Sequence, residues 1–197
     1  MSLRPAARWA RAFGLVVVAL LSAPNGPALA HSFLSKNFDQ LVVEAEEIFV
    51  GTLTAASSSR LATGTIVTDL TFSGVQVVKG HSSSDVRTVR ILGGTVGDLT
   101  LKIMGTPDFD RGRTYLLFSK ENGRAILPFV GGAQGVFRVV PDATTGTELI
   151  VDARGHPMVG SFGGAPGRGV AASRDGSGRP VVSLDVFIQA IRDRLPR

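Results

Sequence analysis

Apolar and polar side chains alternate along much of the chain between residues 48 and 152, which is the period-two pattern of half-buried β-strands. The stretch 63–80, TGTIVTDLTFSGVQVVKG, shows the alternation over the greatest length. Its phase slips at Ser73-Gly74, so that Val75 and Val77 continue on the opposite parity. A glycine at such a slip indicates a β-bulge, and a bulge bends a long strand.

Shorter segments of the same kind are separated by turn signals. Glu121-Asn122-Gly123 predicts a tight hairpin between two of them, 114–119 and 124–130, because Asn-Gly favours the backbone of a two-residue turn. The turn 141–146 pairs two others in the same way. The expected strands besides 63–80 are 48–55, 86–92, 98–104, 114–119, 124–130, 135–140 and 148–152.

Helical spacing is found only near the two ends of this region. Residues 37–46 place apolar side chains at Phe38, Leu41 and Ala45, and Asn37 with Gln40 has the spacing of a capping box. Residues 160–180 contain seven glycines and two prolines, which predicts a flexible loop. The final segment, 181–197, contains a second amphipathic helix over 183–195, and we expect it to pack back on the strands.

Many short strands without βαβ alternation predict an all-β fold. The long bent strand favours a small OB-like barrel, closed or partly open, over a sandwich. We therefore expect a β-barrel domain over 31–159, a short helix at about 37–46, and a C-terminal helix on the barrel.

The first thirty residues have the pattern of a secretory signal peptide. A basic start precedes an apolar run at 13–22, and Ala28-Leu29-Ala30 is a small-residue cleavage site. We expect export to the periplasm or the extracellular space, with no membrane attachment after cleavage. Removing residues 1–30, which carry three arginines and no acidic residue, lowers the net charge from +5 to +2.

The remaining chain offers little catalytic chemistry. Cysteine is absent, and the sequence contains no nucleophile elbow, phosphate-binding lysine motif or basic stripe with interleaved aromatic residues. The glycine-rich 131–135 is interpreted as a tight turn and DFDRG at 108–112 as a charged turn. The sequence thus predicts a non-enzymatic protein without catalytic residues, metal or cofactor, and without nucleic acid as partner.

Three segments carry a resemblance to a known family: LVVEAEEIFVGTL at 41–53, TDLTFSGVQVVKG at 68–80 and GRTYLLFS at 112–119. Together they resemble the bacterial secreted relatives of the tissue inhibitors of metalloproteinases, the netrin-like domains with an OB-type barrel. The resemblance covers roughly residues 38–120. It implies that the mature N-terminus is the working part, since in that family the amine and carbonyl of a first cysteine chelate the protease zinc. His31 occupies the corresponding start here.

We therefore expect an exported binding protein whose partner is another exported protein, in the sharper form a metalloprotease. The candidate partner-binding residues are His31, Ser32 and Phe33. An envelope structural or assembly protein is the first alternative. A metal enzyme is the second, in which His31 joins an imidazole supplied by His81 or His156.

Overall fold

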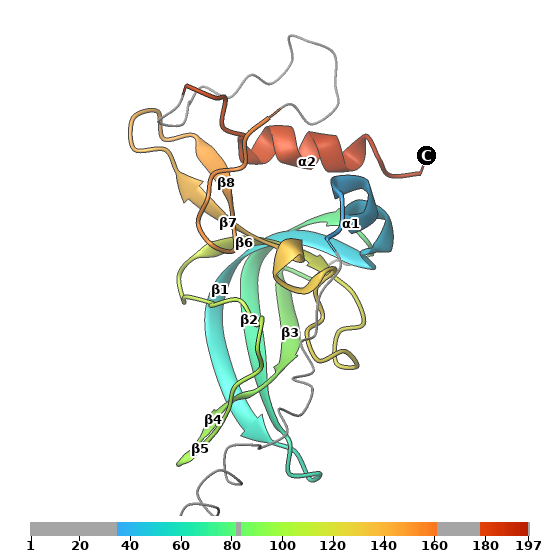
Figure 1. Cartoon of the computed structure of the whole chain (residues 1–197), viewed down its shortest axis with the longest axis vertical. Coiled ribbons are helices and arrows are strands. Elements are labelled where there is room, and N and C mark those ends of the chain that lie inside the picture. Colours follow the sequence, from blue (N-terminus) through green and yellow to red (C-terminus); the bar gives the residue numbers. More distant parts are fainter. Residues whose placement is uncertain (1–34, 82–83, 161–177, 197) are drawn as a thin grey trace, which may run out of the picture. The chain divides into compact units, whose positions relative to one another are not determined.

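The computed structural model describes residues 35–81, 84–160 and 178–196 (Figure 1). Within these ranges the chain is mostly β-structure with two short helices and one 3₁₀ turn. The elements are α1 (Phe38–Glu44), β1 (Glu47–Arg60), β2 (Ile66–Lys79), β3 (Val86–Leu92), β4 (Gly94–Val96), β5 (Leu99–Leu101), β6 (Thr114–Ser119), η1 (Gly132–Gly135), β7 (Val136–Pro141), β8 (Glu148–Asp152) and α2 (Leu184–Arg192).

Six strands form one antiparallel sheet in the order β3-β2-β1-β6-β7-β8, while β4 and β5 pair separately. The bulge expected at Ser73-Gly74 is confirmed by the register of β1 and β2. Val50 lies opposite Gln76 and Thr52 lies opposite Ser73, so two steps along β1 match three along β2. Gly74 absorbs the extra residue at a φ of 61°, a left-handed conformation that glycine adopts without a steric penalty. The strand expected over 98–104 is shorter, since only Leu99–Leu101 pairs.

The outer edge of β3 is covered by a turn rather than by a strand. Leu92 donates a backbone hydrogen bond to the carbonyl of Ile126 over 2.9 Å. The Asn122 side chain accepts from the Arg90 N–H and donates to the Thr88 carbonyl, at 2.9 and 2.8 Å. The expected strand over 124–130 is therefore wrong, although the chain does turn back on β6 after Glu121-Asn122-Gly123. Val130 donates to the Phe118 carbonyl over 2.9 Å, and an antiparallel bridge joins Ser119 to Phe129. An asparagine side chain presents the same donor and acceptor as a peptide, so Asn122 pairs with the edge of β3 from within this turn.

The edge of β8 is covered in a similar way. Ile150 donates to the Val182 carbonyl over 3.0 Å and accepts from the Met158 N–H over 2.9 Å. Among the described residues β3 and β8 do not pair with each other, and no closed barrel is formed. The physical reason is that both outermost strands already use their edge hydrogen-bonding groups on neighbouring irregular segments.

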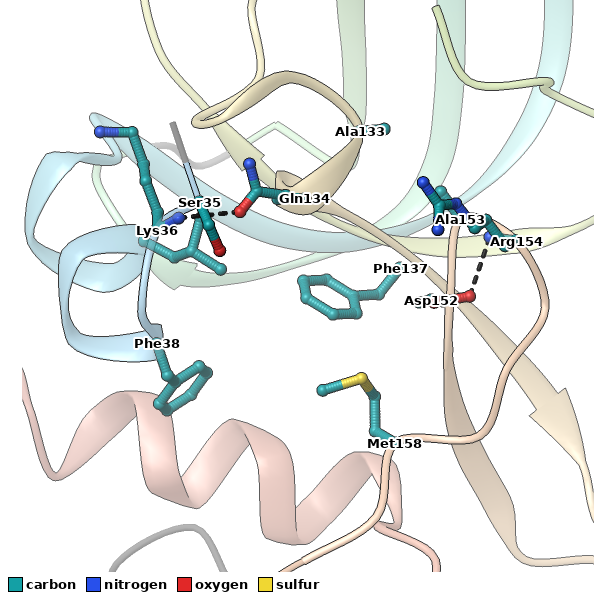
Figure 2. A pocket seen from close by; sticks show the side chains of 11 residues that line it. Ser35, Lys36, Phe38, Ala133, Gln134, Phe137, Asp152, Ala153, Arg154 and Met158 are labelled. Atoms are coloured by element: carbon teal, nitrogen blue, oxygen red, sulfur yellow. Dashed lines mark hydrogen bonds between the residues drawn. The ribbon is translucent and has the colours of Figure 1, made fainter. Parts of the chain in front are cut away.

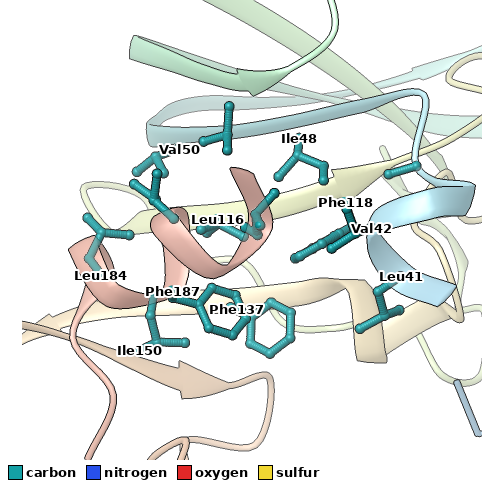
Figure 3. Packing of buried hydrophobic residues seen from close by; sticks show 14 of the residues in the cluster. Leu41, Val42, Ile48, Val50, Leu116, Phe118, Phe137, Ile150, Leu184 and Phe187 are labelled. Carbon is teal, nitrogen blue, oxygen red and sulfur yellow. The ribbon is translucent and has the colours of Figure 1, made fainter. Parts of the chain in front are cut away.

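The sheet is buried on both faces, because alternate side chains of the central strands point to opposite sides. One face packs against α1 and α2 and includes Phe118 and Phe137 (Figure 3). The opposite face includes Phe49, Phe72 and Tyr115 and packs against the chain around Phe129. Burial on both faces explains why the segment TYLLFS of β6 is almost continuously apolar.

The two helices begin as their sequences predict. Asn37 and Gln40 form the reciprocal capping box of α1, and the Ser183 side chain caps α2. The ammonium group of Lys79 donates to the carbonyls of Val42 and Val43 at the end of α1, over 2.7 and 3.0 Å. Partial burial lowers the pKa of this lysine. In the part of the chain that the structure describes, neither helix has the length and apolarity needed to cross a bilayer.

Candidate functional site: a pocket beside the N-terminal segment

A pocket of about 490 Å³ opens between the approach to α1, the turn η1 and the end of β8 (Figure 2). This volume lies within the range of small-molecule and side-chain binding sites, roughly 300–1,000 Å³. It combines an apolar interior with polar groups at the rim. The lining residues are Ser35, Lys36, Phe38, Leu41, Ala133, Gln134, Phe137, Asp152, Ala153, Arg154 and Met158.

The wall formed by Ser35 and Lys36 is fixed by two polar contacts of Lys36. The backbone N–H of Lys36 donates to Oε1 of Gln134 over 2.8 Å, a contact between residues 98 positions apart. The Lys36 ammonium forms an ion pair with Glu44 at 2.6 Å, and Lys120 lies 3.9 Å from the same carboxylate. The hydrogen bond from Lys36 lowers the pKa of Glu44, with smaller contributions from the charges of both lysines. The chain is thus held in place where it approaches α1.

The facing wall is the glycine-rich turn 131–135, as expected a tight turn. Gly131 and Gly132 have φ values of 65° and 63°, so the backbone is left-handed where η1 begins. A Cβ on Gly135 would lie 2.5 Å from the backbone oxygen of Val130, so no larger residue fits without a shift of the backbone. The tight turn that these glycines permit places Gln134 at the rim, where its Nε2 donates to the Gly131 carbonyl over 3.2 Å.

The interior of the pocket is made of aromatic and aliphatic groups. Phe137, which is 4% exposed, projects from β7, and the side chains of Phe38 and Met158 converge on the same space (Figure 2). Behind the pocket Phe187 of α2 supports both rings, with centroids 5.0 Å from Phe38 and 5.1 Å from Phe137. The interior is therefore backed by the folded core.

The polar side of the rim is a turn organised by Asp152. Its Oδ1 accepts hydrogen bonds from the backbone N–H groups of Arg154 and His156, each over 2.8 Å. Its Oδ2 lies 3.2 Å from Nδ1 of His156. Burial raises the pKa of Asp152, but these hydrogen bonds outweigh burial and leave the pKa below its usual value. Asp152 is consequently an ionised, well-satisfied acceptor, and the exposed Arg154 beside it is cationic.

This arrangement is suited to hold an apolar group that carries polar atoms. An apolar group entering the pocket would be desolvated by Phe38, Phe137 and Met158, while polar atoms attached to it would meet charged groups at the rim. His81 lies exposed after β2, and His156 pairs with Asp152. No group of three or more metal-ligating side chains occurs within residues 35–81, 84–160 and 178–196.

The three residues expected to bind a partner, His31, Ser32 and Phe33, lie outside the described residues, as does most of the glycine-rich loop. The pocket itself was not expected from the sequence. Its lining comes from segments around residues 36, 134 and 153, and no local motif connects them. The one signal that points to it is the run of glycines at 131–135, which indicates close approach of two backbones.

Comparison of the chain with protein-family models, with curated proteins and with solved structures found no match.

Proposed function

We propose that this protein is an exported, non-enzymatic binding protein that holds another exported protein at the pocket and at the adjoining residues His31–Phe33. The partner is expected to insert a large apolar side chain between Phe38, Phe137 and Met158. A buried apolar anchor with a polar rim is the usual composition of the strongest part of a protein interface.

The observation that carries the proposal is the location of the pocket on the chain. Its wall contains Ser35 and Lys36, and Lys36 is fixed by the bond to Gln134. Three residues lie between His31 and Ser35, and the four steps that join the two span at most about 14 Å when extended. The candidate N-terminal residues thus directly precede a wall of the apolar pocket in the sequence, and the proposal is that one partner contacts both.

In its sharper form the proposal makes the partner a metalloprotease and the fold a partly open OB-type barrel. The strand connections support this form: β1 pairs with both β2 and β6, and the two strands of 14 residues carry register shifts that bend them. Such barrels present a binding surface at loops and chain ends. In this form the amine of His31 would approach the protease zinc while the pocket holds a neighbouring side chain.

The test begins with the chain secreted from an exporting host, with its first residue established by intact mass. A panel of zinc metalloproteases is then assayed for peptide cleavage in its presence. Inhibition by the chain that starts at His31 is expected, together with its loss when one alanine precedes His31. Inhibition that survives the added alanine would show that the amine does not reach the zinc.

The pocket is tested by a matched pair of substitutions. Ser35→Trp places a bulky ring at the rim, and Ser59→Trp makes the same change at an exposed position of β1. We expect Ser35→Trp to weaken inhibition at least about tenfold, equivalent to about 1.4 kcal/mol, and Ser59→Trp to leave it unchanged. Equal effects of both substitutions, or no inhibition by the unmodified chain, would contradict the proposed role of the pocket.

One observation favours the assembly alternative. Leu99 and Met104 are 53% and 86% exposed near the β4–β5 pair. If these side chains mediate assembly, the secreted chain forms a defined oligomer by sedimentation, and Met104→Ser dissociates it. A monomer that inhibits a protease would leave the binding proposal in place.

A further inference from the structure

A second pocket, of about 230 Å³, lies where β6, β7 and β8 run side by side, and two arginines face it. It is separate from the pocket of the proposed function, since the two share no lining residue. The lining residues are Arg113, Arg138, Val139, Val140, Val151 and Gly155.

Both arginines are held in position by the backbone around them. Arg138 lies in the middle of β7, paired with Tyr115 of β6 and Val151 of β8. Arg113 immediately precedes β6: its N–H donates to the Asp110 carbonyl over 3.3 Å, and its carbonyl accepts from Leu53 over 2.9 Å. Arg138 from β7 and Arg113 from the approach to β6 therefore line the pocket with little freedom in the main chain.

Arg138 has a buried hydrogen-bond donor that is not satisfied among the described residues. Its Nε is buried and has no hydrogen-bond partner among the described residues. Four other arginines, Arg87, Arg90, Arg124 and Arg194, each form an ion pair with a carboxylate. Within residues 35–81, 84–160 and 178–196, no carboxylate pairs with Arg113 or Arg138. A buried charged donor without an acceptor is unfavourable, and such groups in native proteins usually meet a ligand or water.

Gly155 makes room for the guanidinium group of Arg138. A Cβ at this position would lie 2.7 Å from Nη2 of Arg138, so any other residue would displace the side chain. The φ of Gly155 is 88°, which disfavours larger residues independently. The turn after β8 thus brings its backbone close to the arginine and keeps one side of the pocket free of side-chain atoms.

We propose that the pocket between Arg113 and Arg138 binds an oxyanion, the carboxylate or phosphate group of a ligand. A guanidinium presents its N–H donors in a planar fork that matches two oxygens of either group. Two positive charges that form no ion pair among the described residues attract an anion. Val139 and Val151 are buried and make part of the lining apolar, and charged hydrogen bonds are stronger beside apolar groups than in water.

The electrostatic surroundings of Tyr115 agree with this assignment. Burial raises the pKa of the Tyr115 hydroxyl, the charge of Asp110 adds to the rise, and Arg138 and Arg113 oppose it. The charges of both guanidinium groups thus act on the Tyr115 hydroxyl, which also accepts a hydrogen bond from the Asp110 N–H over 2.7 Å. The acidic group that also acts there, Asp110, forms no ion pair with either arginine among the described residues.

The test is a titration of the secreted chain, labelled with ¹⁵N, with sodium phosphate and with sodium acetate. Sodium chloride at matched ionic strength is the reference. We expect saturable shifts of the amide signals of Arg138, Val151 and Gly155 with phosphate, acetate or both, and the stronger of the two identifies the source of the oxyanion. Shifts that are equal in chloride, or that do not saturate, would overturn the proposal.

Three variants locate the binding and one controls for charge. Arg138→Lys keeps the charge but loses the fork, and Arg113→Gln removes an exposed charge without disturbing the core; each is expected to weaken binding about tenfold. Gly155→Ala is expected to abolish it by displacing the guanidinium. Arg124→Gln changes the net charge equally at a side chain that is 73% exposed and should bind normally. If Arg124→Gln and Arg113→Gln weaken binding to the same extent, the attraction is non-specific and the assigned site is wrong.

Discussion

Replacing Phe187 by alanine tests whether α2 belongs to the folded core. Phe187 is fully buried, with ring centroids 5.0 Å from Phe38, 5.1 Å from Phe137 and 6.4 Å from Phe118. It is the one aromatic side chain that α2 contributes, and it backs two residues of the candidate pocket. Its removal therefore affects helix docking and the pocket interior together.

The expected loss of stability is large. Truncating a fully buried phenylalanine to alanine costs about 3–5 kcal/mol, which combines lost transfer free energy with the cavity that remains. The edge-on and tilted ring contacts place Phe187→Ala toward the upper end of that range. For a chain of this size each kcal/mol corresponds to about 2–4 °C, so the melting temperature should fall by roughly 6–20 °C. A typical domain has about 5–15 kcal/mol in total, so the variant is expected to fold but with a much lower margin.

Urea unfolding provides the assay, with one global probe and one probe local to the face of the sheet opposite α2. Far-ultraviolet circular dichroism reports on the backbone. Tyr115 is the single tyrosine, and after removal of the first thirty residues, which contain Trp9, it is the only strong fluorophore. Tyr115 lies in the cluster opposite α2. If the protein unfolds in two states, both probes should shift to the same lower midpoint in Phe187→Ala.

The control is Val43→Ala, on α1, because Val43 is 70% exposed and should change stability by at most about 0.5 kcal/mol. A urea midpoint for Phe187→Ala equal to that of Val43→Ala would mean that α2 is not part of the core. A shift seen by circular dichroism alone, with Tyr115 unchanged, would mean that α2 undocks without unfolding the sheet.

Two further predictions concern pH. Because burial raises the pKa of the Tyr115 hydroxyl, the neutral form stabilises the fold fully below the ordinary tyrosine pKa of about 10, and this contribution is lost as the pH rises through the folded-state pKa. Tyrosinate absorbance should therefore appear together with unfolding. A titration of Tyr115 at the ordinary pKa without unfolding would contradict this prediction. The hydrogen bond from Arg90 lowers the pKa of Asp69, so Asp69→Asn should lose less than about 1 kcal/mol at neutral pH, as for exposed pairs. The difference in stability between Asp69→Asn and the unmodified chain, measured from urea midpoints, should disappear as the pH falls from the ordinary aspartate pKa of about 3.9 through the lower folded-state pKa. A difference that stays constant with pH would exclude the ion pair as its cause.

The elements of this protein were predictable where a local signal decides them. The Asn37–Gln40 capping box, the bulge at Gly74 and the paired strands β7 and β8 follow from residue types at short spacing. Each depends on hydrogen bonds or backbone conformations within a few residues. The expected strand over 124–130 failed because Asn-Gly describes a turn but not its partner, and Asn122 pairs with the edge of β3 instead.

Periodicity and turn signals alone thus predict a β-rich chain with an amphipathic helix at each end and an export signal. That the sheet stays open follows only from the folded arrangement, because it depends on which distant segments occupy the edges of β3 and β8. The two pockets likewise form only when segments distant in sequence meet. Lys36 meets Gln134 across 98 positions, and Arg113 and Arg138 share one pocket because β6 and β7 are neighbours. Such sites arise from contacts distant in sequence, and side-chain periodicity carries no information about which strands become neighbours.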